Sequence, residues 1–231
     1  MESLSQPGLK IALIGATGAI GKEIVKHAQN DERISELALV VRKRLEEWKD
    51  EDFKCKLTVL EYENYDDMSK MENDLQGYDA FMCTLGTRTK TGAENFRKVD
   101  YTYPLEFAKL AQKLNVPHYG LLTSMGANHS SVFLYMRTKG EVENAIKALN
   151  LDNLNIYRPG VLLNRDNDFR IGEKIIGWVP FISKIQSSDV GKVMLEQAVL
   201  SKSQNQVEVR KLSELSNADI ARLATQYNSK L

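Results

Sequence analysis

A glycine-rich turn near the N-terminus constrains the fold more than any other feature of this sequence. The stretch KIALIGATGAIGKEIV places Gly15, Gly18 and Gly21 at three-residue spacing between an apolar run and a segment with helical spacing. The first glycine permits a tight turn, the second lets the backbone approach an anion, and the third lets the helix pack closely on the strand. The free N–H groups at the helix start attract phosphate. We therefore predict a strand, a phosphate-binding turn and a helix; the alternative is a glycine-rich connection without a ligand.

Short apolar runs alternate with helical segments along the rest of the chain, which is typical of a parallel sheet with helices on both faces. The predicted strands cover residues 9–14, 37–41, 57–60, 80–84, 118–123 and 155–157. The clearest helix covers residues 134–149, and Met68, Met71 and Leu75 indicate a weaker one. The predicted fold is therefore α/β, a doubly wound parallel sheet of the Rossmann type, whose ligand crevice lies beyond the carboxyl ends of the strands.

The alternation becomes irregular after Tyr157. We predict a helix over residues 190–200 capped by Asp189, a strand over residues 207–212 and a terminal helix with Asn217 as its N-cap. This region is too short for an independent domain. Residues 1–231 are thus predicted to form one domain, in which residues 158–231 contribute a small lobe on the substrate side.

Composition excludes several classes of protein. The chain has 231 residues, 42% of them hydrophobic, and 31 Lys and Arg balance 31 Asp and Glu, so neither disorder nor recruitment of nucleic acid by net charge is expected. Two cysteines and three scattered histidines offer neither a disulfide framework nor a metal site. No signal peptide or transmembrane segment is recognisable, since the apolar stretch at residues 175–185 is too short and interrupted. We expect a soluble, cytoplasmic protein.

A cationic cluster follows the second predicted strand. Sites for NAD place an acidic residue at this point to bind the ribose 2′-hydroxyl, whereas this chain has Arg42, Lys43 and Arg44. Cations there suit the 2′-phosphate of NADP through charge-assisted hydrogen bonds. The cluster therefore favours NADPH as cofactor, and a solvated basic turn is the alternative.

Tyr135 and Lys139 lie four residues apart on the clearest predicted helix, so both side chains occupy one face. An ammonium beside a phenol stabilises the phenolate and lets it exchange a proton with a substrate hydroxyl or carbonyl. Ser124 follows the preceding strand, where its hydroxyl would polarise a carbonyl oxygen. Together the three residues predict a Ser-Tyr-Lys catalytic site. For the Tyr-Lys pair taken alone, the alternative is two exposed helix residues without a catalytic role.

These features resemble the short-chain dehydrogenase/reductase superfamily. The passages CTLGTRTKTGAENFRKVDYTY, LLTSMGANHSSVFLYMRTKGEVE and YRPGVLL are similar to the Tat-interacting protein family, a set of atypical short-chain dehydrogenases that bind NADPH and include fungal mitochondrial relatives. The resemblance covers residues 10–200. It implies the extended or atypical Rossmann fold and makes mitochondrial association an alternative to the cytoplasmic prediction.

The resemblance also implies roles for individual residues. The diphosphate would be held by Thr17, Gly18, Ala19 and Ile20, beside the turn glycines Gly15 and Gly21. Arg42 with Lys43 would hold the 2′-phosphate, and Leu85 and Gly86 would line the adenosine-ribose side. Tyr135 would be catalytic and Lys139 would also bind the ribose.

Three further positions belong to the nicotinamide and substrate end. The resemblance implies that Leu162 and Arg170 close over the nicotinamide and its phosphate. Ser124 precedes Tyr135 by eleven residues, fewer than in many members of the superfamily, so Thr123 is an alternative for the working hydroxyl.

Two functions of different classes follow. The first is an NADPH-dependent oxidoreductase that reduces a carbonyl or oxidises an alcohol of a small substrate not identified by the sequence. The second is an NADPH-binding regulatory or scaffold protein without significant turnover, which would act with a protein partner.

Overall fold

The computed structural model describes residues 8–163, 183–203 and 211–229. Seven parallel strands form the main sheet in the order β3-β2-β1-β4-β5-β6-β9, and β7 and β8 form a small second sheet. The strands are β1 (Leu9–Ile14), β2 (Ile34–Val41), β3 (Lys56–Glu61), β4 (Ala80–Cys83), β5 (His118–Leu122), β6 (Asn153–Arg158), β7 (Val161–Leu163), β8 (Lys184–Gln186) and β9 (Lys211–Ser216). The predicted doubly wound α/β fold is confirmed.

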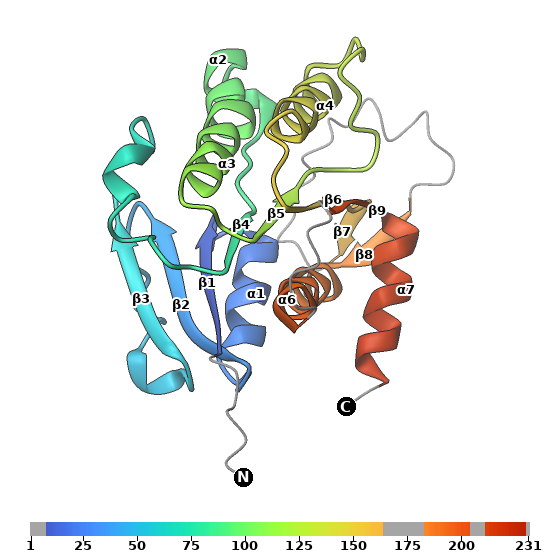
Figure 1. Ribbon diagram of the computed structural model, residues 1–231. Coiled ribbons are helices and arrows are strands. Elements are labelled where there is room, and N and C mark those ends of the chain that lie inside the picture. Colours follow the sequence, from blue (N-terminus) through green and yellow to red (C-terminus); the bar gives the residue numbers. More distant parts are fainter. Residues whose placement is uncertain (1–7, 164–182, 204–210, 230–231) are drawn as a thin grey trace.

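Helices cover both faces of the sheet, with α3 and α4 on one side and α1, α6 and α7 on the other (Figure 1). The α-helices are α1 (Ala19–Ala28), α2 (Ala93–Arg97), α3 (Tyr103–Lys113), α4 (Leu134–Lys147), α6 (Ser187–Ser203) and α7 (Asn217–Asn228). Shorter turns are η1 (Asp50–Asp52), η2 (Met68–Met71), η3 (Thr89–Thr91) and the π-helical η4 (Lys98–Thr102).

The core has two layers because strand side chains alternate between the two faces. In β1, Leu13 packs with α1, α6 and α7, whereas Ile14 packs with α3 and α4. A strand buried on both faces has no solvent side, which is why residues 11–14 of β1 and 37–41 of β2 are continuous apolar runs in the sequence.

Two predictions about helix starts are wrong. Ser216, and not Asn217, is the N-cap of α7, and it forms a capping box with Asp219. The Asn217 side chain instead accepts a hydrogen bond from the Gly160 N–H at 2.7 Å. Helix α6 begins at Ser187, so Asp189 lies in its first turn. The segment predicted as a weaker helix around residue 68 forms only the 3-10 turn η2.

The C-terminal region is joined to the main sheet through β9, which pairs with β6. Helix α6 packs closely on α1. The two helices are so near at Gly191 that an added Cβ would lie 2.9 Å from the Glu23 Cβ. Residues 164–182 and 204–210 lie outside the described residues, so the substrate-side lobe over residues 158–231 stays a prediction.

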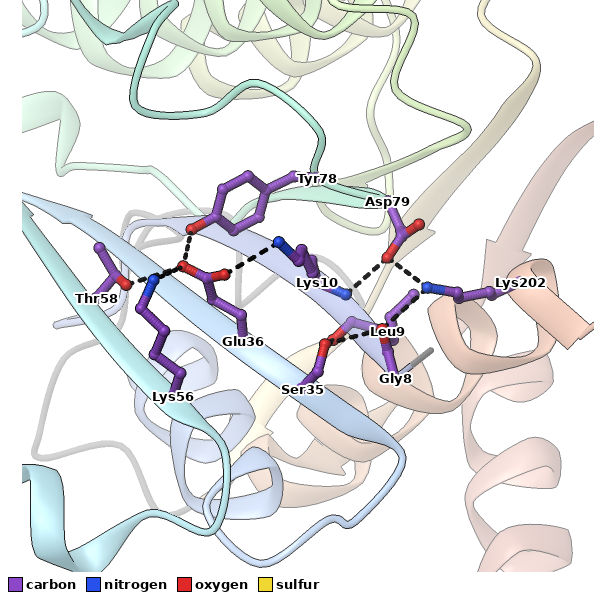
Figure 2. Close-up of polar contacts among 10 residues, drawn as sticks. All are labelled: Gly8, Leu9, Lys10, Ser35, Glu36, Lys56, Thr58, Tyr78, Asp79 and Lys202. Carbon is purple, nitrogen blue, oxygen red and sulfur yellow. Dashed lines mark hydrogen bonds and ion pairs between the residues drawn. The ribbon is translucent and has the colours of Figure 1, made fainter. Parts of the chain in front are cut away.

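A charged cluster closes the amino-terminal edge of the sheet around Glu36 (Figure 2). The largely buried Glu36 carboxylate accepts hydrogen bonds from Lys56 at 2.9 Å, Thr58 at 3.0 Å and Tyr78 at 2.9 Å, and pairs with the Lys10 ammonium at 3.3 Å. Burial alone would raise the pKa of Glu36, but these donors together lower it to about 2. The cluster therefore connects strands β1, β2 and β3 with the segment before β4, which carries Tyr78.

A second carboxylate continues this edge toward α6. Asp79 accepts from the Lys10 backbone N–H at 2.8 Å and from the Lys202 ammonium at 2.7 Å, and Lys202 also donates to the Gly8 carbonyl (Figure 2). The carboxylates at the amino-terminal edge thus serve internal contacts that fasten strands and helix to one another.

Candidate functional site

A cleft opens at the opposite, carboxyl-terminal edge of the sheet. Strand β1 pairs with β2 on one side and with β4 on the other, so the chain reverses direction across the sheet at this point, where doubly wound folds bind ligands. The cleft has a volume of about 740 Å³. Its lining residues come from the glycine turn, the end of β2, the segments after β2, β3 and β4, and the stretch from α2 to the first residue of α3. They are Gly15, Ala16, Thr17, Gly18, Val40, Val41, Arg42, Lys43, Leu45, Glu63, Asn64, Tyr65, Thr84, Leu85, Gly86, Thr87, Asn95, Val99 and Tyr103.

The glycine turn requires two of its three glycines on steric grounds. Gly15 has a φ of +91°, and a Cβ there would lie 2.7 Å from the Thr84 backbone carbon. A Cβ at Gly21 would lie 2.2 Å from the Gly15 carbonyl oxygen, whereas one at Gly18 would lie 3.3 Å from that atom. The turn is thereby held tightly against the residue after β4, at the floor of the cleft.

The start of α1 is open to an anion. Gly18 is the N-cap and makes no side-chain cap, and the first turn contains no acidic residue. The N–H groups of a first helical turn have no partner inside the helix, and the helix dipole favours negative charge there. Thr17 and Gly18 line the cleft, whereas the Ile20 side chain is packed in the core, so Ile20 offers only its backbone to a ligand.

The three cations after β2 separate into two groups. Arg42 and Lys43 line the cleft, and their exposed side chains form no ion pair with any described residue. Arg44 instead donates to the Trp48 carbonyl at 2.6 Å and to Asp50 at 2.9 Å. Tyr65 also lines the cleft, and burial raises the pKa of Tyr65 to about 12. The charge of Arg42 opposes this rise, because Arg42 lies near the Tyr65 hydroxyl.

The two candidate hydroxyls after β5 differ in their bonding. Thr123 donates to the buried Glu143 carboxylate at 2.6 Å, and Arg158 binds the same carboxylate. The buried Ser124 hydroxyl has no hydrogen-bond partner in the described part of the chain. A buried hydroxyl without a partner is unusual. Thr123 is engaged by Glu143, whereas the Ser124 hydroxyl is not, but Ser124, Tyr135 and Lys139 are not among the residues that line the cleft, so the choice of working hydroxyl stays a prediction.

Helix α4 carries Tyr135 and Lys139 one turn apart. The Tyr135 ring lies 5.8 Å from the Phe96 ring of α2, and Asn95, next to Phe96, lines the cleft. The Lys139 ammonium lies 2.8 Å from Asp100 of η4, and both side chains are buried. Tyr135 and Lys139 therefore face the segment that forms one side of the cleft.

Sequence reasoning missed Asp100, although one signal was present. Phe96, Asp100, Tyr103 and Phe107 follow helical spacing, and all four are buried, so a carboxylate stands in an apolar stripe. A charge at such a position needs a partner, but no pattern in the sequence points to Lys139, 39 positions further along the chain, as that partner.

The loop between β5 and α4 is fixed against the helix. The Asn128 N–H donates to the Met136 carbonyl at 2.9 Å. A Cβ at Gly140 would lie 2.1 Å from the His129 nitrogen, so only glycine admits this contact. The loop that follows Ser124 therefore has a defined position relative to α4, the helix that carries Tyr135 and Lys139.

The remaining predicted residues lie as follows. Leu85 and Gly86 line the cleft, Leu162 is half-buried in β7, and Arg170 lies outside the described residues. Burial raises the pKa of Cys83 to about 11, as expected for a thiol packed in the core.

Neither a metal centre nor a membrane span is found in the residues that the structure describes. No three His, Cys, Asp or Glu side chains are grouped so as to hold a metal ion there. Across the same ranges, no helix combines the length and the apolar character that crossing a membrane requires.

Comparison with known proteins identifies the family. A family model described as NAD(P)H-binding matches residues 15–200. The chain is 35% identical to protein HTATIP2 of Rattus norvegicus over 78% of this chain and 75% of the relative. The chain belongs to the Tat-interacting protein family of atypical short-chain dehydrogenases. It is also 35% identical to "Protein FMP52, mitochondrial" of Candida albicans, over 94% of this chain and 98% of that relative, so membership of the family extends over nearly the whole chain.

Solved structures share the fold at low sequence identity. A putative NAD-dependent epimerase/dehydratase from Bacillus halodurans superimposes with a TM-score of 0.66 at 21% identity, covering 95% of this chain and all of that one. MoeE5 in complex with UDP-glucose and NAD gives a TM-score of 0.66 at 13% identity, covering 95% of this chain and 82% of that one. These structures show that the fold is shared, and the NAD(P)H-binding family match over residues 15–200 supports the predicted nicotinamide dinucleotide as cofactor.

Proposed function

We propose that the chain binds NADPH in the cleft and uses it to reduce a carbonyl or oxidise an alcohol. The residues present fit this cofactor. The uncapped start of α1 offers N–H groups to the diphosphate. Arg42 and Lys43 offer cleft-lining charges, with no carboxylate partner in the described chain, to a 2′-phosphate. NADH would leave both cations without an anion, which is why we favour NADPH.

The catalytic part of the proposal is carried by the buried hydroxyl of Ser124, which has no hydrogen-bond partner among the described residues. NADPH supplies a hydride when bound. Ser124 donates a hydrogen bond to the substrate oxygen as negative charge develops on it. Tyr135 delivers the proton to that oxygen, and the Lys139 ammonium stabilises the resulting phenolate and binds the nicotinamide ribose. In the direction of alcohol oxidation, Tyr135 accepts the proton instead.

The test compares NADPH consumption across a panel of carbonyl compounds for the wild type and Tyr135→Phe. Loss of the hydroxyl removes the proton donor but keeps the ring beside Phe96, so we expect turnover to fall at least about 100-fold with unchanged NADPH affinity. Tyr101→Phe is the matched control. It removes the same group from a tyrosine whose ring lies under Arg97 and which has no role in the proposed chemistry. Equal turnover for wild type and Tyr135→Phe would contradict this role.

A second function is favoured by one observation, the buried ion pair between Lys139 and Asp100. A lysine already paired with a carboxylate stabilises a nearby phenolate less, because the carboxylate offsets its charge. The second candidate is therefore an NADPH-binding regulatory protein that acts through a protein partner. Tight NADPH binding without turnover of any substrate in the panel would favour it.

The names of the relatives bear on the cellular location. Several fungal relatives carry the word mitochondrial in their names, so we propose mitochondrial association in place of a purely cytoplasmic location. Fractionation of cells that produce the tagged full chain tests this. Recovery in the cytosolic fraction alone would overturn it.

A further inference from the structure

A buried carboxylate on α4 connects this helix with the ends of β5 and β6. The Glu143 side chain is 2% exposed. Its Oε1 accepts hydrogen bonds from the Thr123 hydroxyl at 2.6 Å and from Arg158 Nε at 3.0 Å, and its Oε2 accepts one from Arg158 Nη2. Thr123 directly follows β5, and Arg158 is the last residue of β6. One carboxylate therefore relates the helix to two neighbouring strand ends.

Glu143 continues the line of residues on α4 to which we assign the chemistry. Tyr135, Lys139 and Glu143 follow one another at intervals of four residues, so they occupy neighbouring positions along one side of the helix. The proposed proton donor and the acceptor for the Thr123 hydroxyl thus belong to the same rigid element.

The backbone is fixed on both sides of Ser124. The Thr123 N–H donates to the Tyr157 carbonyl at 2.8 Å, and the Met125 N–H donates to the Pro159 carbonyl at 2.8 Å. These bonds align the segment with β6 and the residues after it. The contact between Thr123 and Glu143 then sets the position of the same segment relative to α4.

The buried ion pair is better explained by position than by stability. Desolvation offsets the attraction in a buried ion pair, and an apolar pair of similar volume is often as stable or more so. Arg158 also pairs with Glu214 at 2.8 Å, and Glu214 pairs with Lys147. An apolar side chain in place of Glu143 would fill the same space but would give the Thr123 hydroxyl no acceptor on the helix.

We propose that Glu143 is a positioning residue that sets the Ser124 hydroxyl relative to Tyr135. The proposal rests on the proposed function, in which both groups act on the same substrate oxygen. A hydrogen-bond donor stabilises a developing charge only when it is held in place beforehand, and a displacement of about 1 Å greatly reduces the rate. Glu143 acts through Thr123, the residue next to Ser124.

The test measures kcat and KM for the NADPH-dependent reduction of benzaldehyde, cyclohexanone and menadione. Thr123→Val removes the hydroxyl and keeps the branched shape. We expect kcat to fall about tenfold, with KM for the carbonyl and NADPH affinity within about twofold of the wild type, because the contact matters in the transition state. Thr123→Ser returns a hydroxyl and should restore kcat.

Glu214→Gln is the matched control. It removes a charge from the outer side of Arg158, but Glu214 accepts no hydrogen bond from Thr123. Its kcat should stay within about twofold of the wild type. A loss in Glu214→Gln as large as that in Thr123→Val would overturn the proposal.

A second variant replaces the ion pair itself and covers the case in which Thr123→Val does not fold. Glu143→Met combined with Arg158→Met exchanges the two charges for apolar side chains of similar length. We expect its urea midpoint to equal or exceed that of the wild type, while kcat falls about tenfold. A folded double variant with wild-type kcat would overturn the proposal.

Combination with Ser124→Ala separates positioning from a merely structural role. If Glu143 and Thr123 act through Ser124, Thr123→Val should change kcat by less than about twofold once the Ser124 hydroxyl is gone. The same factor in both backgrounds would contradict the positioning role. Full activity in Ser124→Ala would make Thr123 the working hydroxyl and would also overturn it.

Failure of the proposed function gives a different result. A wild type that reduces none of the three carbonyl compounds with NADPH would overturn the proposed function and the positioning role with it. Wild-type turnover with equal kcat in every Thr123 and Glu143 variant would overturn the positioning role alone.

Discussion

The polar groups at the two edges of the sheet differ in whether they have partners within the described part of the protein. At the amino-terminal edge, Glu36 has four donors around it and Asp79 has two. At the carboxyl-terminal edge, Arg42 and Lys43 line a cleft with no carboxylate partner in the described chain, and the Ser124 hydroxyl has no partner there. The Glu36 and Asp79 carboxylates at the first edge have their donors within the protein, whereas the groups at the second edge are those for which we propose a ligand.

This contrast distinguishes charges that stabilise the fold from charges that bind. Arg42 and Lys43 are exposed and line the cleft at the topological switch point, which is where doubly wound folds bind ligands. The carboxylates of Glu36 and Asp79, which have donors within the protein, give no such indication. Substitutions at the two edges should therefore change different properties.

Gly21→Ala should cause the largest effect. The added Cβ would lie 2.2 Å from the Gly15 carbonyl oxygen and force the turn away from α1. We expect a loss of about 3 kcal/mol in the free energy of unfolding, measured by urea denaturation, together with loss of NADPH binding.

Gly18→Ala is the matched control, because its Cβ would lie 3.3 Å from the same oxygen. It should cost less than about 1 kcal/mol of stability, since a shift of a few tenths of an ångström relieves the contact. Equal costs for the two variants would contradict the steric account of the turn.

His118 is an exception at the amino-terminal edge, because its ring nitrogens are buried without a partner among the described residues. Burial lowers the pKa of His118 to about 4. The unfolded chain takes up a proton at this group near pH 6.5, but the folded chain does so only near pH 4. The free energy of unfolding should therefore fall by up to about 3 kcal/mol as the pH decreases across this window.

The measurement is the difference in unfolding free energy between the wild type and His118→Leu from pH 7 to pH 4. The variant should lack this part of the acid sensitivity, since its side chain takes up no proton. Parallel curves would show that His118 contributes nothing to it.

Glu36→Gln should weaken the fold but leave the cleft intact. Hydrogen bonds to charged groups contribute more than neutral ones, so we expect a loss of about 2 kcal/mol at pH 7 with unchanged NADPH affinity. The pKa of Glu36 is about 2 in the folded chain against 4.5 ordinarily, so the contribution is present above pH 4.5 and is lost as the pH falls toward 2.

Glu32→Gln is the control for Glu36, because Glu32 pairs with Lys54 on the exposed surface. It should change stability by less than about 0.5 kcal/mol. A reduced NADPH affinity in Glu36→Gln would contradict the separation of the two edges.

The fold was predictable from the sequence because its signals are local. Strand β1 was predicted with its observed bounds, since its residues 11–14 form a continuous apolar run that ends at the turn at Gly15. The other strands of the main sheet were predicted with ends that differ by up to four residues, the largest difference being at β9, which was predicted over residues 207–212 and ends at Ser216, and β7 and β8 were not predicted. Ser216 was missed as an N-cap because Asn217, beside it, is an equally good capping residue, and only the contact with Gly160 excludes it.

The site was predictable only where a residue acts next to the strand that carries it. Arg42 and Ser124 follow strand ends, so sequence position alone brings them to the carboxyl-terminal edge. The engagement of Arg44 with Asp50 and the pairing of Asp100 with Lys139 depend on side-chain contacts that no periodicity encodes. The same holds for the cluster around Glu36, which joins residues from four segments of the chain.

We infer that Arg42 and Lys43, which have no ion-pair partner in the described chain, bind the 2′-phosphate of NADPH at the carboxyl-terminal edge. The most direct test of this inference is a titration of wild type, Arg42→Ala and Arg44→Ala with NADPH and with NADH. Arg42→Ala should lose about 20-fold in NADPH affinity, the effect of one charge-assisted contact, and none in NADH affinity. Arg44→Ala, whose side chain serves Asp50 and Trp48, should bind both as the wild type does. Unchanged NADPH affinity in Arg42→Ala would contradict the account.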